Sequence, residues 1–482
     1  MIRANYADRG TPAFRVLTDA QCHAIYLAAL DCLDQIGVEV ANAEARELLR
    51  AAGARVEGTR ARLAPHLVKD ALAATPPAFT LWGRDPGREI RVAPDRVHFG
   101  PGLTNTYFID PDTGERRPAR RGDAGLTARV ADALPNIDYV MGLALIGDVR
   151  PDLASVYEFA ELLANTGKPI IAWAHKPANV AAMVRMAAAV AGGEEALRAR
   201  PLFALFSTYP SPLRHTDEDL ANLLLAAGHG IPVVYLGGPT VGLESPVTGA
   251  SGLVLHLAVA LSGLTIVQLK QRGAAMAIGA VLSAMDMRTL RPAYGSPEMS
   301  LYSAAAADVA RYLHLPFMGT AGASESKLLD AQAGLEAAIQ VLMAALSGAA
   351  LVHDAGFLDC ADIGSLGMLA LTDEIIGMVR RIMRGVEVNE ETIMLDLLAA
   401  VGPAGSFLDQ PRSVNRARQE IWVPTLLDRA PYALWEQAGR LDAAGRAMDK
   451  VRKILARHRP TPLDPAAAAQ IAEILAAAES GN

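Results

Sequence analysis

Aromatic residues are scarce in this chain, since Phe, Tyr and Trp together make up 5% of its 482 residues. Cysteine is scarcer still: only Cys22, Cys32 and Cys360 are present, and no two of them form a Cys-x-x-Cys pair. A secreted domain held together by disulfides and a structural zinc site built on thiolates are therefore excluded. Three isolated thiols fit a reducing compartment, and we expect a cytoplasmic protein.

Cationic clusters and long apolar runs are also missing. The formal net charge is −7, and no stretch interleaves aromatic with basic residues, which disfavours nucleic-acid binding. The most apolar stretch, 253–269, is interrupted by His256, Ser262 and Gly263, so we do not expect it to span a membrane. The N-terminal sequence MIRANYADRG lacks the apolar region of a signal peptide. We expect neither a nucleic acid nor a membrane as a partner.

Several common catalytic signatures are absent as well. The sequence contains no GxSxG elbow, no phosphate-binding GKS/T loop and no GxGxxG dinucleotide fingerprint. Its histidines fall in separate predicted elements, so no group has zinc-ligand spacing. Lys270 and Lys327 lie in helix-like stretches rather than in strands, which disfavours Schiff-base chemistry. These absences predict a site with no metal and no tightly bound nucleotide cofactor.

The chain does contain a repeated alternation of strand and helix patterns. Apolar residues make up 51% of the sequence, and short apolar runs end near residues 102, 147, 174, 207, 237, 282, 321 and 356. A helix-like stretch follows each run. Eight such repeats predict an α/β fold of the (β/α)8 barrel type. Barrel enzymes carry their active sites at the C-terminal ends of the strands, so the chemistry is expected there.

Three domains are expected along the chain. Residues 1–95 are predicted to form a small α+β cap, which begins with one helix over 18–52 that Thr18 caps. Residues 96–387 are predicted to form the barrel. Residues 388–482 are predicted to form a helical extension, interrupted by prolines and suited to packing or to contacts between subunits. We therefore expect a homo-oligomer.

Aromatic residues follow three of the predicted strands. Tyr107 comes after the FGPG turn, Trp173 ends the third strand, and Tyr209 follows the fourth strand. Three aromatic rings at strand ends can enclose a substrate ammonium through cation–π interactions. Packing at the rim of the barrel is the alternative for each of them.

Charged residues and one histidine mark the later strands. Glu244 lies in the long connection 238–248, and Asp286 and Arg288 lie in the long connection 283–297. An Arg at the barrel mouth suits capture of a carboxylate, although a mutual Asp–Arg bridge explains the pair equally well. Glu244 could pair with a cationic substrate, but a solvated loop charge is the commoner explanation. His353 falls within the eighth strand, with Asp354 expected on its opposite face, and a hydrogen-bonded structural role is its alternative. The candidate catalytic residues are His353 and Asp286, and the candidate substrate-binding residues are Tyr107, Trp173, Tyr209, Glu244, Arg288 and His353.

Several segments together resemble the trimethylamine methyltransferase family. They include HFGPG at 98–102, TGERRPA at 113–119, ADALPNIDYV at 131–140, GKPIIAWA at 167–174, SPVTGASGL at 245–253, YGSPE at 294–298, SESKLLDAQAGLEAA at 324–338 and VGPAGSFL at 401–408. The resemblance runs from about residue 18 to 430. It implies a (β/α)8 fold and the transfer of a methyl group from an amine to the cobalt of a separate corrinoid protein, so that cobalamin arrives with a partner.

The resemblance also implies a substrate class. Archetypal family members demethylate trimethylamine with pyrrolysine, whereas this sequence contains only the standard twenty residues and is similar to the branch that acts on quaternary amines such as glycine betaine. A quaternary nitrogen is already fully charged, so its methyl group needs positioning rather than acid–base catalysis. In this interpretation Tyr107, Trp173 and Tyr209 hold the ammonium, and His353 or Arg288 meets a substrate carboxylate.

Two other functions stay open from the sequence. A barrel lyase or a folate-dependent demethylase of methylated amines would place Asp286 and His353 within hydrogen-bonding reach of each other. A non-catalytic protein that binds methylated amines would have its C-terminal helices folded across the barrel mouth.

Overall fold

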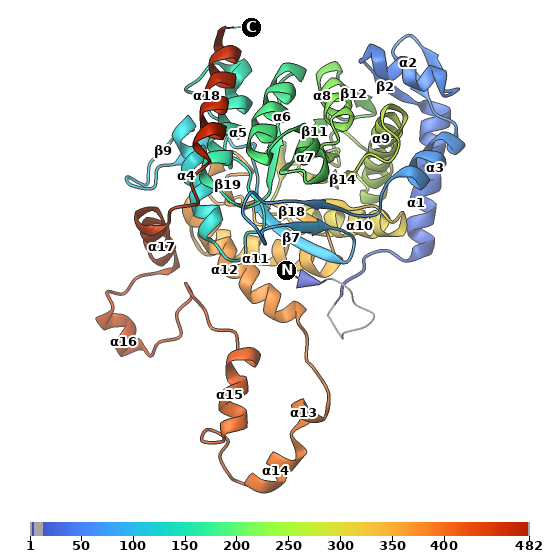
Figure 1. Ribbon diagram of the computed structural model, residues 1–482. Helices are drawn as coiled ribbons and strands as arrows, with labels where there is room; N and C mark the ends of the chain where they lie inside the picture. The colour runs from blue at the N-terminus through green and yellow to red at the C-terminus, as the bar shows by residue number, and fades with distance from the viewer. Residues whose placement is uncertain (1, 4–12, 481–482) are drawn as a thin grey trace.

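The centre of the computed structural model, which describes residues 2–3 and 13–480, is a curled sheet of seven parallel strands (Figure 1). Neighbouring strands in the sheet are, in order, β7 (Arg96–Pro101), β18 (Leu351–Ala355), β17 (Phe317–Thr320), β14 (Met276–Ala280), β13 (Val233–Gly237), β11 (Phe203–Tyr209) and β10 (Ile170–Trp173). The short strand β1 (Ile2–Arg3) pairs antiparallel with β7. The predicted α/β class is confirmed.

Helices cover the outer face of the sheet, at the positions that the alternating pattern predicts. In the described part of the chain they are α4 (Arg121–Ala133), α5 (Ala154–Asn165), α6 (Pro177–Ala191), α8 (Asp217–Gly228), α9 (Gly249–Lys270), α10 (Pro297–Tyr312), α11 (Ala331–Ser347) and α12 (Leu366–Met383). By length and composition, helix α9 is long and apolar enough to cross a membrane. However, 78% of its apolar 18-residue segment is buried inside the protein. Its burial is that of a core helix.

Residues 138–147, which the pattern predicts as the second strand, do not form a strand. The Asp138 and Leu143 amides donate to carbonyls on the β7 side, at 2.7 Å and 2.8 Å, and the Val140 amide donates to Pro169 ahead of β10 at 2.9 Å. A φ of 67° at Leu143 interrupts the extended backbone. The structure therefore shows a seven-stranded curl, and closure into an eight-stranded barrel stays a prediction.

The inner face of the curl is apolar and is filled from the end where the strands begin. Side chains such as Ile171, Phe206 and Leu351 form one inner cluster, and the hairpin of β5 (Phe79–Leu81) and β6 (Ile90–Val92) packs against it. The Trp82 amide beside this hairpin donates to the Pro201 carbonyl, just ahead of β11. The hairpin thus covers the starting ends of the strands and leaves the finishing ends for a site.

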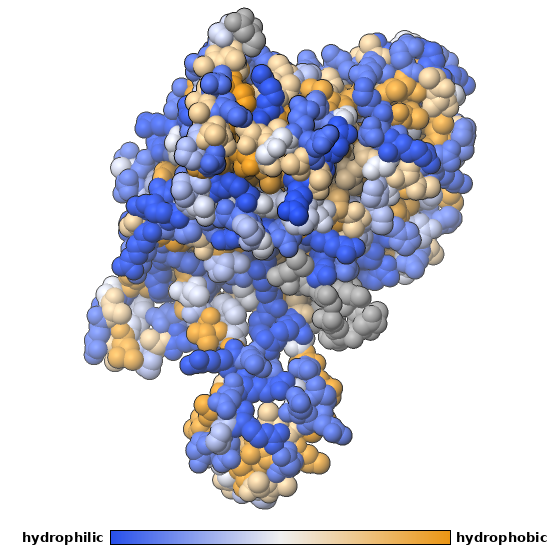
Figure 2. Space-filling view, in the orientation of Figure 1, coloured by the Kyte–Doolittle hydropathy of each residue, from blue (hydrophilic) through white to orange (hydrophobic). Residues whose placement is uncertain are grey.

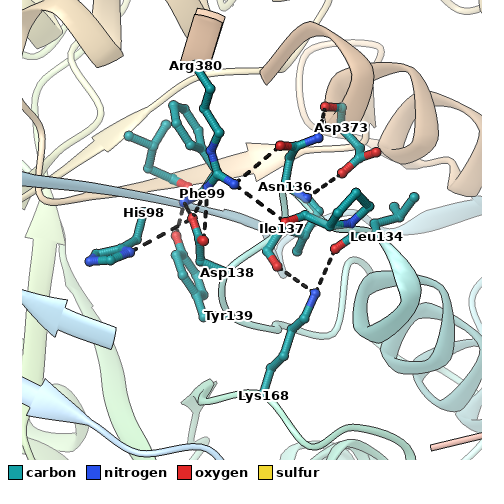
Figure 3. A network of polar contacts seen from close by, with 12 residues as sticks. His98, Phe99, Leu134, Asn136, Ile137, Asp138, Tyr139, Lys168, Asp373 and Arg380 are labelled. Atoms are coloured by element: carbon teal, nitrogen blue, oxygen red, sulfur yellow. Dashed lines mark hydrogen bonds and ion pairs between the residues drawn. The ribbon is translucent and has the colours of Figure 1, made fainter. Parts of the chain in front are cut away.

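A buried polar network ties the starting end together (Figure 3). The Lys168 ammonium donates to the carbonyls of Ala131, Leu134 and Ile137 at 2.6–2.7 Å, and its burial lowers the pKa to about 8. The Asp138 carboxylate accepts two hydrogen bonds from Arg380 of α12, at 2.9 Å and 2.7 Å. Polar residues at this end of a parallel barrel are typical of stability rather than catalysis.

The predicted single helix over 18–52 is wrong. Helix α1 (Asp19–Asp31) begins with the predicted Thr18 cap, but after a π-helical turn the chain forms β2 (Val38–Val40) and only then α2 (Ala43–Ala51). Gly37 ends the first helix with a φ of 82°, and a Cβ there would lie 2.5 Å from the Ala61 carbonyl oxygen. The strand that follows pairs with β4 (Arg60–Arg62) and with β12 (Arg214–His215), which joins the cap to the sheet's own loops.

The chain beyond α12 leaves the body and then returns to it. Helices α13 (Glu390–Ile393), α14 (Leu395–Val401), α15 (Pro411–Glu420) and α16 (Tyr432–Gln437) project away in Figure 1. Helix α17 (Ala443–Arg457) then packs on α12 and α4, and α18 (Pro465–Ser480) packs on α6 and α5. The returning helices therefore lie on the outer layer of helices.

Candidate active site

Polar side chains gather on the inner face where β17 and β18 end. His353 is buried, and its Nε2 lies 3.1 Å from the Thr320 hydroxyl of the neighbouring strand. The Phe206 ring of β11 meets the His353 ring edge to face, with centroids 5.9 Å apart. A histidine, a hydroxyl and an aromatic ring from three strands thus meet at the end of the sheet where barrel enzymes place their chemistry.

Asp354 joins this group instead of facing the opposite side of the strand, as the alternation predicted. A bulge interrupts the pairing of β18 with β7 between Val352 and Ala355, and Asp354 takes a φ of 83°. Its Oδ1 lies 2.5 Å from His353 Nδ1. Since a carboxylate only accepts hydrogen bonds, Nδ1 carries a proton, while the Thr320 hydroxyl lies near both Nε2 and, at 3.4 Å, the Ala280 carbonyl. The carboxylate therefore fixes the orientation of His353.

A glycine makes room for this arrangement on the neighbouring strand. A Cβ at Gly102, directly after β7, would lie 2.3 Å from Asp354 Oδ1 and 2.2 Å from the Phe357 ring. Any larger residue at position 102 would push the Asp354 carboxylate away from His353. The FGPG turn therefore contributes to the site because Gly102 has no side chain, which leaves room for the Asp354 carboxylate.

Trp173 and Glu158 lie close together at the same end of the sheet, and the indole Nε1 of Trp173 is buried without a hydrogen-bond partner among the described residues. Trp173 ends β10 and packs against the inner cluster, and Glu158 of α5 is buried against Gly142, where a Cβ would lie 2.4 Å from its carboxyl carbon. Burial raises the pKa of Glu158 to about 8, and the indole N–H of Trp173 opposes that rise. The Glu158 carboxyl is therefore mostly neutral at pH 7, and its Oε2 has no hydrogen-bond partner among the described residues.

Solvent reaches the inner face beside these residues. Thr208 follows Ala204 and Phe206 on the inner side of β11, and it is exposed although Ser207 and Tyr209 on either side are buried. Inner-face residues of the curl are otherwise packed. The exposure of Thr208 marks the finishing end of β11 as open to small molecules.

The two long connections pair with each other above the sheet. The Val241 amide donates to the Ser283 carbonyl at 2.8 Å, and the Met285 amide donates to the Val241 carbonyl at 3.0 Å. The second connection folds into a hairpin of β15 (Ala284–Asp286) and β16 (Arg291–Ala293). Their tips expose large apolar side chains, namely those of Leu243, Val247, Met287 and Leu290.

The charged residues of these connections that the sequence predicts for the site form hydrogen bonds within their own loops. Asp286 accepts hydrogen bonds from the Arg288 amide at 2.9 Å and from its guanidinium at 3.3 Å, which lowers the pKa of Asp286. The Arg288 side chain is 89% exposed. Glu244 accepts from the Thr240 amide at 2.8 Å. The structure therefore shows the mutual Asp–Arg bridge, and it does not bring Asp286 to His353.

The three predicted aromatic residues lie apart. Tyr209 points outward from the sheet, where its hydroxyl lies 2.6 Å from His256 Nδ1 of α9 and its ring packs against Tyr235. Tyr107 of β8 (Tyr107–Ile109) is covered by the Arg116 guanidinium, 3.2 Å from the ring centroid. Only Trp173 of the three packs against the inner cluster.

Sequence reasoning missed several residues of the site. Thr320 and Phe206 sit inside apolar strand runs with nothing to set them apart, and Glu158 looks like any charge on an amphipathic helix. One signal was available for Asp354, because it precedes Ala-Gly at the end of a buried strand. Bulges are common at such strand ends when an active site is nearby. Among the described residues, no three His, Cys, Asp or Glu side chains are grouped so that they could hold a metal ion.

Comparison with known proteins defines the family. The sequence profile of the trimethylamine methyltransferase (MTTB) family matches residues 2–480. The chain belongs to the trimethylamine methyltransferase family. It is 31% identical to the trimethylamine methyltransferase MttB of Desulfitobacterium hafniense strain DCB-2, over 95% of this chain and 92% of that protein. It is 29% identical to the glycine betaine methyltransferase of D. hafniense strain Y51, over 96% and 97%.

Two solved structures have a similar fold. The hydroxylamine complex of MtmB matches with a TM-score of 0.51 at 12% identity, covering 93% of this chain and 97% of that one. The Methanosarcina barkeri monomethylamine methyltransferase matches with a TM-score of 0.50 at 13% identity, covering 90% and 97%. At these identities the likeness concerns the fold. The resemblance of this chain to the trimethylamine methyltransferase family is confirmed by the profile and the relatives.

Proposed function

We propose that this protein transfers a methyl group from a quaternary or other methylated amine, such as glycine betaine, to the cobalt of a separate corrinoid protein. The observation that carries the proposal is the family match over residues 2–480 in a chain built only from the twenty standard amino acids. One relative of similar identity acts on glycine betaine, a substrate whose nitrogen is already quaternary. No covalent activation of such an amine is needed before its methyl group is taken.

The site offers a polar end and an apolar end for such a substrate. The aromatic faces of Trp173 and Phe206 suit a trimethylammonium group, and His353 and Thr320 form the polar end of the site beside them. The corrinoid supplies a strongly nucleophilic cobalt centre. The protein's own residues bind the cation, orient one methyl group outward and exclude competing nucleophiles, which is catalysis by positioning and electrostatics. Asp354 supports this by holding His353 in one orientation.

The corrinoid protein is expected to dock on the loops above the sheet. The methyl group has to leave from the end where the strands finish, because the β5–β6 hairpin fills the other end. The apolar tips of the two paired connections, including Met287 and Leu290, are exposed at this end. Exposed apolar side chains at a rim are typical of surfaces that bind another protein.

The remaining parts of the proposal concern the fold, the cofactor, the location and the assembly of the protein. We propose a barrel closed by residues 138–147, with domain boundaries at 95 and 387, no tightly bound cofactor, a cytoplasmic location and assembly as a homo-oligomer. Catalytic roles for His353 and Asp286, and substrate contacts by Tyr107, Trp173, Tyr209, Glu244 and Arg288, are predictions from the sequence. Of these residues, His353 and Trp173 have the surroundings that such roles require.

The test is methyl transfer to free cob(I)alamin, followed by absorbance, with trimethylamine, glycine betaine, proline betaine, carnitine and choline offered in turn. We expect methylcobalamin from at least one quaternary amine. Methylcobalamin from trimethylamine alone would contradict the proposed substrate class. The same series repeated with a cognate corrinoid protein controls for a requirement for the natural acceptor.

Two alternative functions have less support. A lyase or a folate-dependent demethylase needs Asp286 near His353, but these residues bind Arg288 and Asp354 instead. A non-catalytic binder needs helices across the strand ends, but α17 and α18 pack mainly on outer helices, and α18 meets the apolar cluster beside Trp173 through Leu475 and Ala478 near its end. Calorimetric binding of an amine without any methyl transfer, in the presence of a corrinoid protein, would favour the binder.

A further inference from the structure

Residues 386–420, called here the arm, carry apolar side chains that this chain does not bury. None of the residues of α13, α14 and α15 is buried. Figure 2 shows apolar side chains gathered on this projecting lobe, below the body in the view. The large exposed apolar residues of the arm are Val386, Val388, Ile393, Leu395, Leu398, Phe407, Leu408 and Val414.

Short helices of this kind need a surface to pack against. Helices α13, α14 and α15 have 4, 7 and 10 residues. Isolated helices below about 12 residues are marginal in water, and packing of an apolar face usually supplies their stability. The arm therefore has the composition of a segment that is stabilised by contact with another surface.

Several charged side chains at the base of the arm pair with one another. Arg416 on the returning limb pairs with Glu387 of the outgoing limb at 3.1 Å and with Glu420 at 3.3 Å. Arg384 at the base also pairs with Glu420, at 3.2 Å. At the end of the arm, three amides of residues 425–427 donate to Glu374 of α12. The arm is thus a loop held at its base by ion pairs and followed by the bonds to Glu374, and its large apolar side chains are exposed.

The body carries a matching apolar surface next to the base of the arm. Leu335 and Ile339 lie one turn apart on α11, and Met378 and Ile382 lie one turn apart on the neighbouring helix α12. All four side chains are exposed. Ile382 lies four residues before Val386, so this surface is continuous with the exposed apolar residues of the arm.

The exposed area is also large for a chain of this size. The accessible surface is 20322 Å² for a mass of 50.8 kDa, whereas a compact monomer of that mass exposes about 17,000 Å². The excess of about 3,000 Å² exceeds the roughly 1,000–2,500 Å² that each partner buries in an obligate homodimer. The chain as a whole therefore exposes enough extra surface for a stable interface.

The position of the arm separates it from the proposed docking site of the corrinoid protein. Helix α12 begins after β18 at the finishing end of the strands, and its last turn lies at the starting end, where Arg380 binds Asp138. The arm leaves from that turn. A partner bound at the strand ends that carry His353 would approach the molecule from the other side.

We propose that the arm of each chain packs on the α11–α12 surface of a second copy of the same chain. The occupant is a second copy because the arm and its matching surface are both unpaired in one chain, and because the arm and Ile382 at its base lie away from the end that serves the corrinoid protein. Exchange between copies covers both surfaces at once.

The test compares the masses of full-length variants by sedimentation at micromolar concentration. Wild-type protein is expected at twice 50.8 kDa or more. The arm variant Leu395→Glu/Leu408→Glu is expected to fall to the monomer mass with an unchanged thermal midpoint, since neither side chain is part of the core. The control Leu27→Glu, at an exposed leucine on α1, is expected to keep the wild-type mass.

A mixing experiment identifies the surface that the arm contacts. The surface variant Ile339→Glu/Ile382→Glu is also expected to be a monomer. Mixed with the arm variant, it is expected to form a hetero-oligomer, because its intact arm finds the intact surface of the other chain. A monomeric wild type, an arm variant that still assembles, or a mixture that stays monomeric would overturn the proposal. The readout is mass, so failure here would leave the methyl-transfer proposal unaffected.

Discussion

At the scale of single residues, the site depends on pairs that hold each other in place. His353 was predicted from a polar residue in a buried strand, and the structure adds the carboxylate that fixes it. Asp354 could not be assigned to the same face from the sequence, because a bulge reverses the alternation at that one position. Trp173 was predicted from its position at a strand end, whereas Glu158 beside it gave no signal.

Replacement of Asp354 tests whether the orientation of His353 matters for activity. Asp354→Asn keeps the shape but removes the charged hydrogen bond to Nδ1, which is worth about 1.5–3 kcal/mol. We expect kcat/KM for methyl transfer to fall about 10- to 100-fold. Asp70→Asn is the matched control, because Asp70 is an exposed residue of α3 (Pro65–Ala74) outside the site, and it should change kcat/KM by less than about twofold. Equal losses in both variants would contradict the assignment.

Replacement of Glu158 tests whether its carboxyl group is neutral in the folded protein. The folded-state pKa of about 8 lies above the unfolded value of about 4.3. The folded protein therefore holds the extra proton between these values, and the free energy of unfolding falls as pH rises through that window, by at most about 1.4 kcal/mol per pH unit. Glu158→Gln should abolish that slope and gain stability at pH 8 in urea titrations. The same change at Glu161, a partly exposed residue of α5, should leave the slope intact.

At the scale of helices and strands, the order of elements could be predicted well, and side-chain direction could not. Seven of the eight predicted strands formed, because short apolar runs between helical patterns are specific to parallel sheets. Parallel strands are buried on both faces, so the apolar run before Tyr209 gave no indication of which face looks inward. The helix over 18–52 failed because helical periodicity continues across Gly37, where the chain turns into a strand.

Because Tyr209 points outward whereas Trp173 packs against the inner cluster, we expect opposite effects from variants of these two residues. Tyr209→Phe leaves His256 without its partner and should lower the free energy of unfolding by about 1–3 kcal/mol, with no effect on amine affinity. Trp173→Ala should weaken amine binding by about 0.5–2 kcal/mol. Calorimetry and chemical denaturation on both variants measure the two effects. Weaker amine binding in Tyr209→Phe at wild-type stability would show that Tyr209 lines the site after all.

At the scale of the whole molecule, the two ends of the sheet serve different purposes. The starting end holds the Lys168 and Arg380 networks and the β5–β6 hairpin, all of which stabilise the fold. The finishing end holds His353, Trp173, exposed Thr208 and the paired loops. The arm extends from the starting end. This division lets a homo-oligomer assemble without covering the surface from which a methyl group must leave.

The most direct test of the central claim is a balance of methyl groups in one turnover series with glycine betaine and cob(I)alamin. The account predicts one methylcobalamin and one dimethylglycine for each glycine betaine consumed, with both products lost together when Trp173 is replaced by Ala. Dimethylglycine without methylcobalamin, while glycine betaine is consumed, would contradict transfer to cobalt and would indicate a different acceptor for the methyl group.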